Sequence, residues 1–229
     1  MIAILAAMDI ELEALKALMS DITYKSIKSV EVIFGKLDGH DVILSKSGVG
    51  KVEAAIRTAI ILEEFDVELL IDIGSSGSLK EEIGVGSVII PSVLAYHDLD
   101  VPDWPKDFQD LRHVFHPDSR LLRIAKRLEG DDCHILPHVT GDAFIYRQDQ
   151  WEKILKEYPS AASVEMEATA IANAATILDV PFIIIRAISD VVIKEGSEVV
   201  YDEFLQHAAE RSAIFCKRFI KEFKYEYCK

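Results

Sequence analysis

The feature that most limits how this chain can fold is a regular alternation between short apolar runs and longer amphipathic runs. Continuous apolar runs predict strands at residues 1–8, 69–79, 86–96, 134–146 and 181–189, and a hairpin at 31–48 that turns at Asp38-Gly39. Apolar residues at helical spacing predict helices at 9–19, 49–65, 118–128, 168–178 and 201–223. This order is typical of an α/β fold on a largely parallel sheet. Because no proline- or glycine-rich linker interrupts residues 1–229, we expect a single domain.

The composition favours a protein that acts on a small molecule. The formal net charge of −14 argues against a nucleic-acid partner, because binding to a phosphate backbone depends on clustered lysine and arginine. Cys133, Cys216 and Cys228 are an odd number without metal-ligand spacing, which favours a reducing compartment. The N-terminal run lacks a basic lead, and no apolar run approaches the ~20 residues of a membrane span. We therefore expect a cytoplasmic protein without a membrane partner.

Polar groups gather where four of the predicted strands end. Open α/β sheets bind ligands in the crevice beyond the carboxyl ends of their strands. The four strand ends are followed by Glu11, by the glycine-serine loop at 74–78, by the pair Glu165 and Glu167, and by Asp190. We therefore expect these groups to line one pocket.

Asp190 and Glu11 each allow a chemical and a structural interpretation. Asp190 ends a strongly apolar run, where partial desolvation would raise its pKa towards values useful for a general acid. A role as the cap of the following segment is the alternative. Glu11 lies in the turn after the first predicted strand, where an acidic residue also complements the dipole of the helix that follows. The residue pattern alone leaves both alternatives open.

The run SVEMEATAIANA, residues 163–174, places two carboxylates where an apolar strand meets an alanine-rich helix. If residues 163–167 are extended, Glu165 and Glu167 point to one face and Met166 points to the other. At least one carboxylate, with the backbone around Met166, then reaches a ligand that carries two adjacent hydroxyl groups, such as a sugar. The alternative is a solvated first turn of the helix.

Seven motifs along the chain resemble those of the bacterial 5′-methylthioadenosine/S-adenosylhomocysteine nucleosidases, which belong to the nucleoside phosphorylase superfamily. The motifs are AAMDIELEAL, SKSGVGKVEAA, DIGSSGSL, YHDLDV, TGDAFI, SVEMEATAIA and PFIIIRAISDV, and together they cover essentially the whole chain. The resemblance implies a single-domain, three-layer α/β fold with a central mixed, largely parallel twisted sheet flanked by helices. It also implies hydrolysis of the N-glycosidic bond of 5′-methylthioadenosine and S-adenosylhomocysteine, with 5′-deoxyadenosine as a further candidate substrate. The products would enter methionine salvage and methyl-cycle recycling.

The catalytic roles below are implied by this resemblance. The family reaction passes through an oxocarbenium-like transition state, which needs an acid for the leaving group and an activated water on the other side of the sugar. Asp190 is expected to protonate the imidazole-ring nitrogen of the purine, and Ser189 is expected to hold its carboxyl group. Glu11 is expected to orient and deprotonate the water, with Ser75 and Arg186 nearby.

The resemblance also implies how the substrate is held. Glu167 is expected to bind the ribose hydroxyls beside the Met166 backbone, which leaves Glu165 in a structural role. Adenine is expected to stack on one aromatic ring and to meet the backbone of the next residue, and the alkylthio group is expected to occupy an apolar pocket. These contacts are assigned to Phe144 and Ile145 for adenine, and to Val49, Val101 and Tyr201 for the alkylthio group.

Phosphate use separates the hydrolases of the superfamily from its phosphorylases. The phosphorylases carry an arginine two residues before the pair that matches Gly74-Ser75, and here that position is Asp72. An acidic group would repel phosphate, so hydrolysis is favoured over purine nucleoside phosphorolysis. Asp72 also departs from the neutral residue expected in the nucleosidases, and a surface pair with a neighbouring lysine is another interpretation of it. An aminofutalosine nucleosidase and a nucleoside-binding module without catalysis are the remaining alternatives.

Neither a metal ion nor a cofactor is expected. His113 and His116 lie in a polar insertion without a matching partner motif for a metal. The segment around Trp104 is predicted to be an ordered loop. By resemblance this loop closes over the pocket of a neighbouring subunit, which predicts a symmetric homodimer, although Trp104 packing within its own chain is the alternative.

Overall fold

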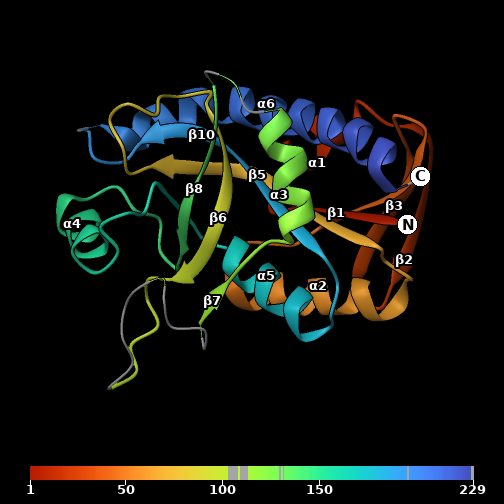
Figure 1. Ribbon diagram of the computed structural model, residues 1–229, viewed down its shortest axis with the longest axis horizontal. Coiled ribbons are helices and arrows are strands. Elements are labelled where there is room, and N and C mark those ends of the chain that lie inside the picture. Colours follow the sequence, from red (N-terminus) through yellow and green to blue (C-terminus); the bar gives the residue numbers. More distant parts are fainter. Residues whose placement is uncertain (103–107, 109–112, 129, 131, 195, 228–229) are drawn as a thin grey trace.

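A computed structural model describes residues 1–102, 108, 113–128, 130, 132–194 and 196–227, in which strands and helices alternate (Figure 1). The strands are β1 (Ile2–Ala6), β2 (Ser20–Ile27), β3 (Val30–Leu37), β4 (His40–Lys46), β5 (Leu69–Ser78), β6 (Val88–Tyr96), β7 (Val114–Phe115), β8 (Cys133–Thr140), β9 (Ser163–Glu165) and β10 (Phe182–Val191). The helices are α1 (Asp9–Lys16), α2 (Lys51–Glu64), α3 (Ser119–Arg127), α4 (Gln148–Glu157), α5 (Ala168–Ile177) and α6 (Ser197–Tyr227).

The strands form one mixed sheet that closes on itself at one end. β5 pairs with β10, β10 with β6, β6 with β8, β8 with β9, and β9 returns to β5, so these five strands make a ring. β1 and β4 extend the sheet from β5 through parallel pairs, and β3 and β2 add an antiparallel edge. The mixed α/β sheet confirms the predicted fold class. The closure into a ring was not predicted from the sequence.

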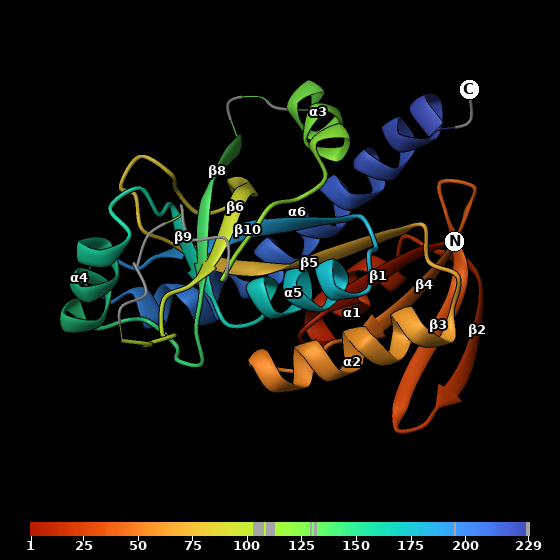
Figure 2. The same cartoon turned by 60° about the horizontal axis from the view of Figure 1, so that its bottom comes forward.

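Helices cover both faces of the sheet, as Figures 1 and 2 show from two directions. α1, α3 and α6 lie on one face, where Leu15, Ile124 and Phe219 pack with Ile4 and Ile71 in one buried cluster. α2 and α5 lie on the opposite face, where a second cluster joins their apolar residues to those of β1 and β10. None of the helices in the described ranges is long and apolar enough to cross a lipid bilayer.

The strand β10 shows why the sequence signal for a buried strand was strong. All ten residues from Phe182 to Val191 are buried, because β10 lies inside the sheet with a helical layer on each side. A strand covered on both faces takes a continuous apolar run rather than an alternating one. The polar residues at its carboxyl end, Ser189 and Asp190, therefore stand out as buried polar groups that need partners.

Several predicted boundaries were wrong. β2 was missed because its residues are mostly exposed and lack an apolar alternation, and α4 was missed between two other elements. The predicted strand 134–146 ends at Thr140, since the Asp142 N–H donates to the Asp98 side chain rather than to a strand. α6 begins at Ser197 instead of Tyr201.

Candidate active site

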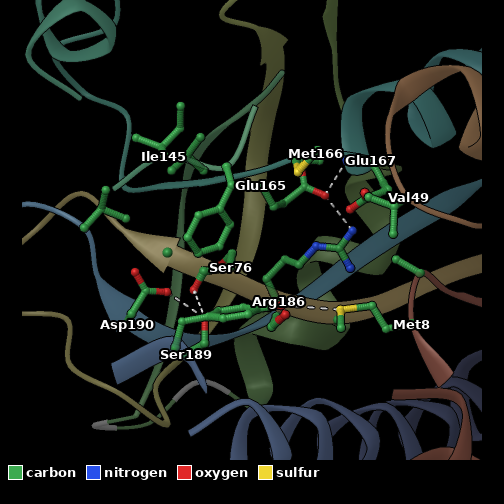
Figure 3. Close-up of a pocket in the computed structure, with 18 of the residues that line it drawn as sticks. Met8, Val49, Ser76, Ile145, Glu165, Met166, Glu167, Arg186, Ser189 and Asp190 are labelled. Carbon is green, nitrogen blue, oxygen red and sulfur yellow. Dashed lines mark hydrogen bonds and ion pairs between the residues drawn. The ribbon is translucent and has the colours of Figure 1, made fainter. Parts of the chain in front are cut away.

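A cavity lies where the carboxyl ends of β5 and β10 meet the turn after β1 (Figure 3). Its walls also include segments 143–145 and 164–167 and the start of α6. The predicted strand ends thus meet at one place. The cavity brings together the predicted residues Glu11, Val49, Ser75, Phe144, Ile145, Met166, Glu167, Arg186, Ser189, Asp190 and Tyr201.

Val101 is the predicted site residue that does not line this cavity. It follows the last residue of β6 by five positions. The assignment of Val101 to the alkylthio pocket therefore stays a prediction, since a cavity built from one chain does not test it. The prediction for Trp104 lies outside the described residues.

Glu11 is fixed by four hydrogen bonds. One carboxylate oxygen accepts the backbone N–H groups of Ala7 and Met8, each at 3.1 Å. The other oxygen accepts the backbone N–H of Ser75 at 2.9 Å and its hydroxyl at 3.0 Å. Glu11 is 2% exposed, so its carboxylate is held in one orientation at the cavity rather than in solvent at the end of a helix.

A β-bulge directs Asp190 into the cavity. In the pairing of β10 with β5, Ile188 lies opposite Ser76 and Asp190 lies opposite Gly77, which leaves Ser189 as an extra residue. Successive side chains of a regular strand point to opposite faces, and a bulge of this kind changes where they point. Ser189 and Asp190 accordingly both line the cavity, and the Ser189 hydroxyl donates to Asp190 Oδ1 at 2.8 Å.

The surroundings of Asp190 favour its protonated form. Burial raises the pKa of Asp190 to about 6, with a smaller contribution from the negative charge of Glu198, while the hydrogen bond from Ser189 opposes the change. A carboxyl group with this pKa can carry a proton close to neutral pH. Asp190 therefore has the property of a general acid.

The raised pKa of Asp190 predicts a stability effect that depends on pH. An aspartate whose folded pKa rises from 3.8 to about 6 favours folding fully below pH 3.8 and loses this contribution as pH rises through 6. Asparagine cannot ionise, so Asp190→Asn should be more stable than the unmodified protein by on the order of 1–3 kcal/mol at neutral pH. Urea denaturation of both proteins at about pH 4 and about pH 7 measures this difference. An equal difference at both pH values would contradict the expectation.

Glu165 and Glu167 have different partners. Glu165 accepts hydrogen bonds from His138 Nε2 at 3.0 Å and from the Thr140 hydroxyl at 2.5 Å, and its other oxygen accepts the N–H groups of Glu167 and Ala168 at 2.9 and 2.8 Å. It therefore caps the start of α5. Burial alone would raise the pKa of Glu165, but Arg186 and His138 hold it well below its usual range.

Glu167 keeps most of its hydrogen-bonding capacity. The described hydrogen bond to its carboxylate is donated by the Gly50 N–H to Oε1 at 2.7 Å. Burial and the negative charge of Glu165 raise the pKa of Glu167 to about 8. Hydroxyl donors from a ligand would favour the ionised form. Glu167 is thus the carboxylate of the pair that is suited to bind a diol.

Arg186 lies beneath the cavity between two carboxylates. Its Nη2 donates to Asp72 and to Glu165, the latter at 2.9 Å. Arg186 and Asp72 are 1% and 0% exposed, so the interpretation of Asp72 as a partner of a surface lysine was wrong. Gly74 allows this approach, because a Cβ atom there would lie 2.7 Å from Arg186 Nη1 and 3.1 Å from Glu11 Oε1.

Aromatic and apolar groups complete the cavity. Phe144 and Tyr201 form an edge-to-face pair with ring centroids 5.0 Å apart, and Tyr201 also donates to the sulfur of Met8 at 3.4 Å. Phe144 is 41% exposed, which leaves a ring face available for stacking.

Sequence reasoning missed two groups that shape the site. These are the Gly50 N–H, which contacts Glu167, and His138, which is fully buried and contacts Glu165. The glycine spacing in SGVGK, residues 47–51, is the signal in the sequence that marks the first. His138 lies inside an apolar strand run, where the sequence does not reveal its partner.

The fold and the arrangement of this cavity agree with comparisons to known proteins. The sequence matches the family described as the Phosphorylase superfamily over residues 1–221. A 5′-methylthioadenosine/S-adenosylhomocysteine nucleosidase from Staphylococcus haemolyticus is 36% identical, covering 96% of this chain and 99% of the relative. The chain belongs to this nucleosidase family of the Phosphorylase superfamily.

Solved structures show the same relationship. The nucleosidase of S. pneumoniae, solved with the transition-state inhibitor MT-ImmA, has a TM-score of 0.91 and 33% identity, covering 97% of this chain and 99% of its own. The nucleosidase of Colwellia psychrerythraea, solved in complex with adenine, has a TM-score of 0.90 and 30% identity, covering 96% and 94% of the two chains.

Proposed function

We propose that this protein hydrolyses the N-glycosidic bond of 5′-methylthioadenosine and S-adenosylhomocysteine and releases adenine and the thioribose product. The observation that carries the proposal is that Glu11 and Asp190 line one cavity, the first oriented by four hydrogen bonds and the second with a raised pKa. Glycoside hydrolysis with an acid and a water-activating base needs two such carboxyl groups. The ligands of the related structures support adenine nucleosides as the substrate class.

In the proposed mechanism, Asp190 donates its proton to the imidazole-ring nitrogen of adenine as the bond between that ring and the ribose breaks. Glu11 accepts a proton from a water molecule, whose oxygen forms the new bond to the ribose carbon. The Ser75 hydroxyl and the backbone N–H groups keep the Glu11 carboxylate aimed at this water. Glu11 then releases the proton it accepted to solvent and Asp190 regains one, so the enzyme returns to its starting state and one water molecule is consumed in each turnover.

The remaining roles concern binding. Glu167, beside the Met166 backbone, accepts hydrogen bonds from the ribose hydroxyls, while Phe144 stacks on adenine next to Ile145. Val49 and Tyr201 form the apolar surface for the alkylthio group. The Arg186 guanidinium contacts Asp72 and Glu165, and so holds the Glu165 carboxylate in place at the wall of the pocket. The products suit methionine salvage and methyl-cycle recycling, and the odd cysteine count supports a cytoplasmic location.

The charges of the cavity favour water over phosphate as the acceptor. The described lining residues include four acidic side chains and one cationic side chain, and the cation already contacts two carboxylates. A phosphate dianion would meet net negative charge at close range. The residues concerned are Glu11, Glu165, Glu167 and Asp190, with Arg186 as the cation.

Incubation with 5′-methylthioadenosine, with and without inorganic phosphate, tests the proposed function. We expect adenine and free methylthioribose under both conditions. A phosphorylated sugar that appears only with phosphate would indicate a phosphorylase, and intact substrate would indicate a binding module. A panel that adds S-adenosylhomocysteine, 5′-deoxyadenosine and aminofutalosine at equal enzyme concentration separates the candidate substrates.

We also propose a symmetric homodimer in which the exposed apolar face of α2 meets the same face of a second copy. Val52 and Ile56 are 69% and 55% exposed and lie one helical turn apart. Val49, at 57% exposure, connects this face to the cavity. In such a dimer the segment around Trp104 reaches the pocket of the partner. This would account for Val101 lying outside the cavity of its own chain.

Charge on the α2 face should separate the subunits. We expect the double variant Val52→Glu with Ile56→Glu to be monomeric in analytical ultracentrifugation, because a charge buried in the interface opposes association. Its KM for 5′-methylthioadenosine should be higher than that of the unmodified protein. The matched control is Ile177→Glu, which alters a residue with 75% exposure on α5. A dimer that persists in the α2 variant, or one lost equally in the control, would contradict this arrangement.

A further inference from the structure

Three separate segments of the chain meet at one ionic cluster, formed by Lys51, Asp98 and Asp142, at the N-terminal end of α2. Lys51 Nζ donates to both carboxylate oxygens of Asp98 at 2.6 Å and lies 3.6 Å from Asp142 Oδ2. Two backbone groups complete the cluster: the Lys51 N–H donates to Asp142 Oδ1 at 2.8 Å, and the Asp142 N–H donates to Asp98 Oδ2 at 2.9 Å. The segments joined in this way are the first residue of α2, the chain after β6 and the chain after β8.

The cluster is directly connected to the candidate ribose ligand. The residue before Lys51 is Gly50, whose N–H donates to Glu167 Oε1 at 2.7 Å. Gly50 has a φ of 87°, and a Cβ atom there would lie 3.2 Å from Asp142 Oδ1. Its backbone conformation thus suits glycine, and the adjacent N–H groups of Gly50 and Lys51 donate to Glu167 and to Asp142 respectively.

None of the three members of the cluster lines the cavity, among the residues that the structure describes. Their side chains are also partly exposed, at 24% for Lys51, 30% for Asp98 and 45% for Asp142. Ion pairs at such positions contribute little to global stability. An effect of this cluster should therefore be seen in ligand binding more than in the unfolding of the protein.

Two further observations indicate that the cluster is well defined. Lys51 Nζ lies 5.5 Å from the ring centroid of Tyr96, which adds a cation–π contact. Burial alone would raise the pKa of Asp98, but the hydrogen bonds from Lys51 and from the Asp142 backbone hold it below its usual range. Asp98 is thus an ionised partner for Lys51 at neutral pH.

We propose that Lys51, Asp98 and Asp142 are positioning residues that hold the Gly50 N–H against Glu167 and so set how tightly the pocket binds the ribose of its substrate. The inference rests on the proposed role of Glu167 as the ligand of the ribose hydroxyls. When the cluster is broken, the loop before α2 is released and Glu167 loses a charge-assisted hydrogen bond. Adenine has no ribose, so its binding depends much less on this contact.

Lys51→Met tests the proposal through a comparison of nucleoside and base. We expect the KM for 5′-methylthioadenosine to rise by about tenfold or more, the loss expected for one charge-assisted hydrogen bond. The kcat and the Kd for adenine should change by less than about threefold, since Asp190 and Phe144 are untouched. Lys51→Arg should restore the KM, because a guanidinium can bind both Asp98 oxygens.

The matched control is Lys46→Met, which removes a Lys–Asp pair of similar length outside the cluster, between Lys46 and Asp9 at 2.7 Å. Its KM should stay unchanged. If Lys51→Met does not fold, Asp98→Asn tests the same contact with a smaller change. An unchanged KM in the folded variant, or an equal loss of affinity for adenine and nucleoside, would overturn the proposal.

The same variants separate this proposal from the proposed function. If the unmodified protein releases no adenine, the proposed function fails. Calorimetric binding of 5′-methylthioadenosine and of adenine still tests the cluster in that case.

Discussion

Asp190→Asn should reduce the rate of adenine release by at least about 100-fold while leaving the fold intact. Asparagine has nearly the same shape and can still accept the hydrogen bond from the Ser189 hydroxyl, which Asp190 accepts at 2.8 Å. It cannot donate a proton to the leaving base. Single-turnover release of adenine from 5′-methylthioadenosine measures the loss, and circular dichroism checks the fold.

Asp202→Asn is the matched control, because Asp202 is an exposed aspartate close to Tyr201 on α6. Its rate should stay close to that of the unmodified protein. Near-normal adenine release by Asp190→Asn would refute the acid role. Equal losses in both variants would indicate a general effect of charge near α6 instead of a proton transfer.

Arg186→Leu should produce the largest loss of stability among single substitutions at this site. Arg186 is 1% exposed, and its removal leaves the carboxylates of Asp72 and Glu165 buried without their shared cation. Removing one partner of a buried ion pair lowers the free energy of unfolding by about 3–5 kcal/mol. This is a large part of the stability of a typical domain, so urea denaturation should show a clearly lower midpoint.

Arg57→Leu is the control for this substitution, since Arg57 forms a surface pair with Glu53 at 2.7 Å and should give little change. The double variant Arg186→Leu with Asp72→Asn should recover part of the loss, because one of the two uncompensated charges is then absent. If Arg186→Leu unfolds at the same urea concentration as Arg57→Leu, the buried ion pair does not stabilise the fold.

The sequence predicted the sheet and most helices because apolar periodicity reports burial directly. It also predicted that four strand ends meet, since parallel strands place their carboxyl ends at one edge. β2 was missed because an exposed edge strand lacks that signal. The ring closure was missed because pairing between strands distant in sequence leaves no local pattern.

The finer features of the site depend on contacts that a sequence does not display. From the sequence alone, Asp72 can be interpreted as a surface charge, because its partner Arg186 lies far away in the sequence on β10. Ser189 and Asp190 line the cavity together because of a bulge in the pairing of β10 with β5, which no spacing in the sequence indicates. Glu165 and Glu167 differ in partners, although their spacing alone makes them look alike.

The ring of strands β5, β10, β6, β8 and β9 has a consequence for how the protein reaches its working form. β5 is made early and β10 near the end of synthesis, yet they pair along their length, Leu70 with Phe182 and Ser78 with Val191. Contacts between distant segments slow folding, because a long loop must close, at a cost in chain entropy, before these contacts can form and stabilise the protein. The cavity therefore forms late, and a nascent chain that stops before β10 has no Asp190 and no closed ring with which to recognise a nucleoside.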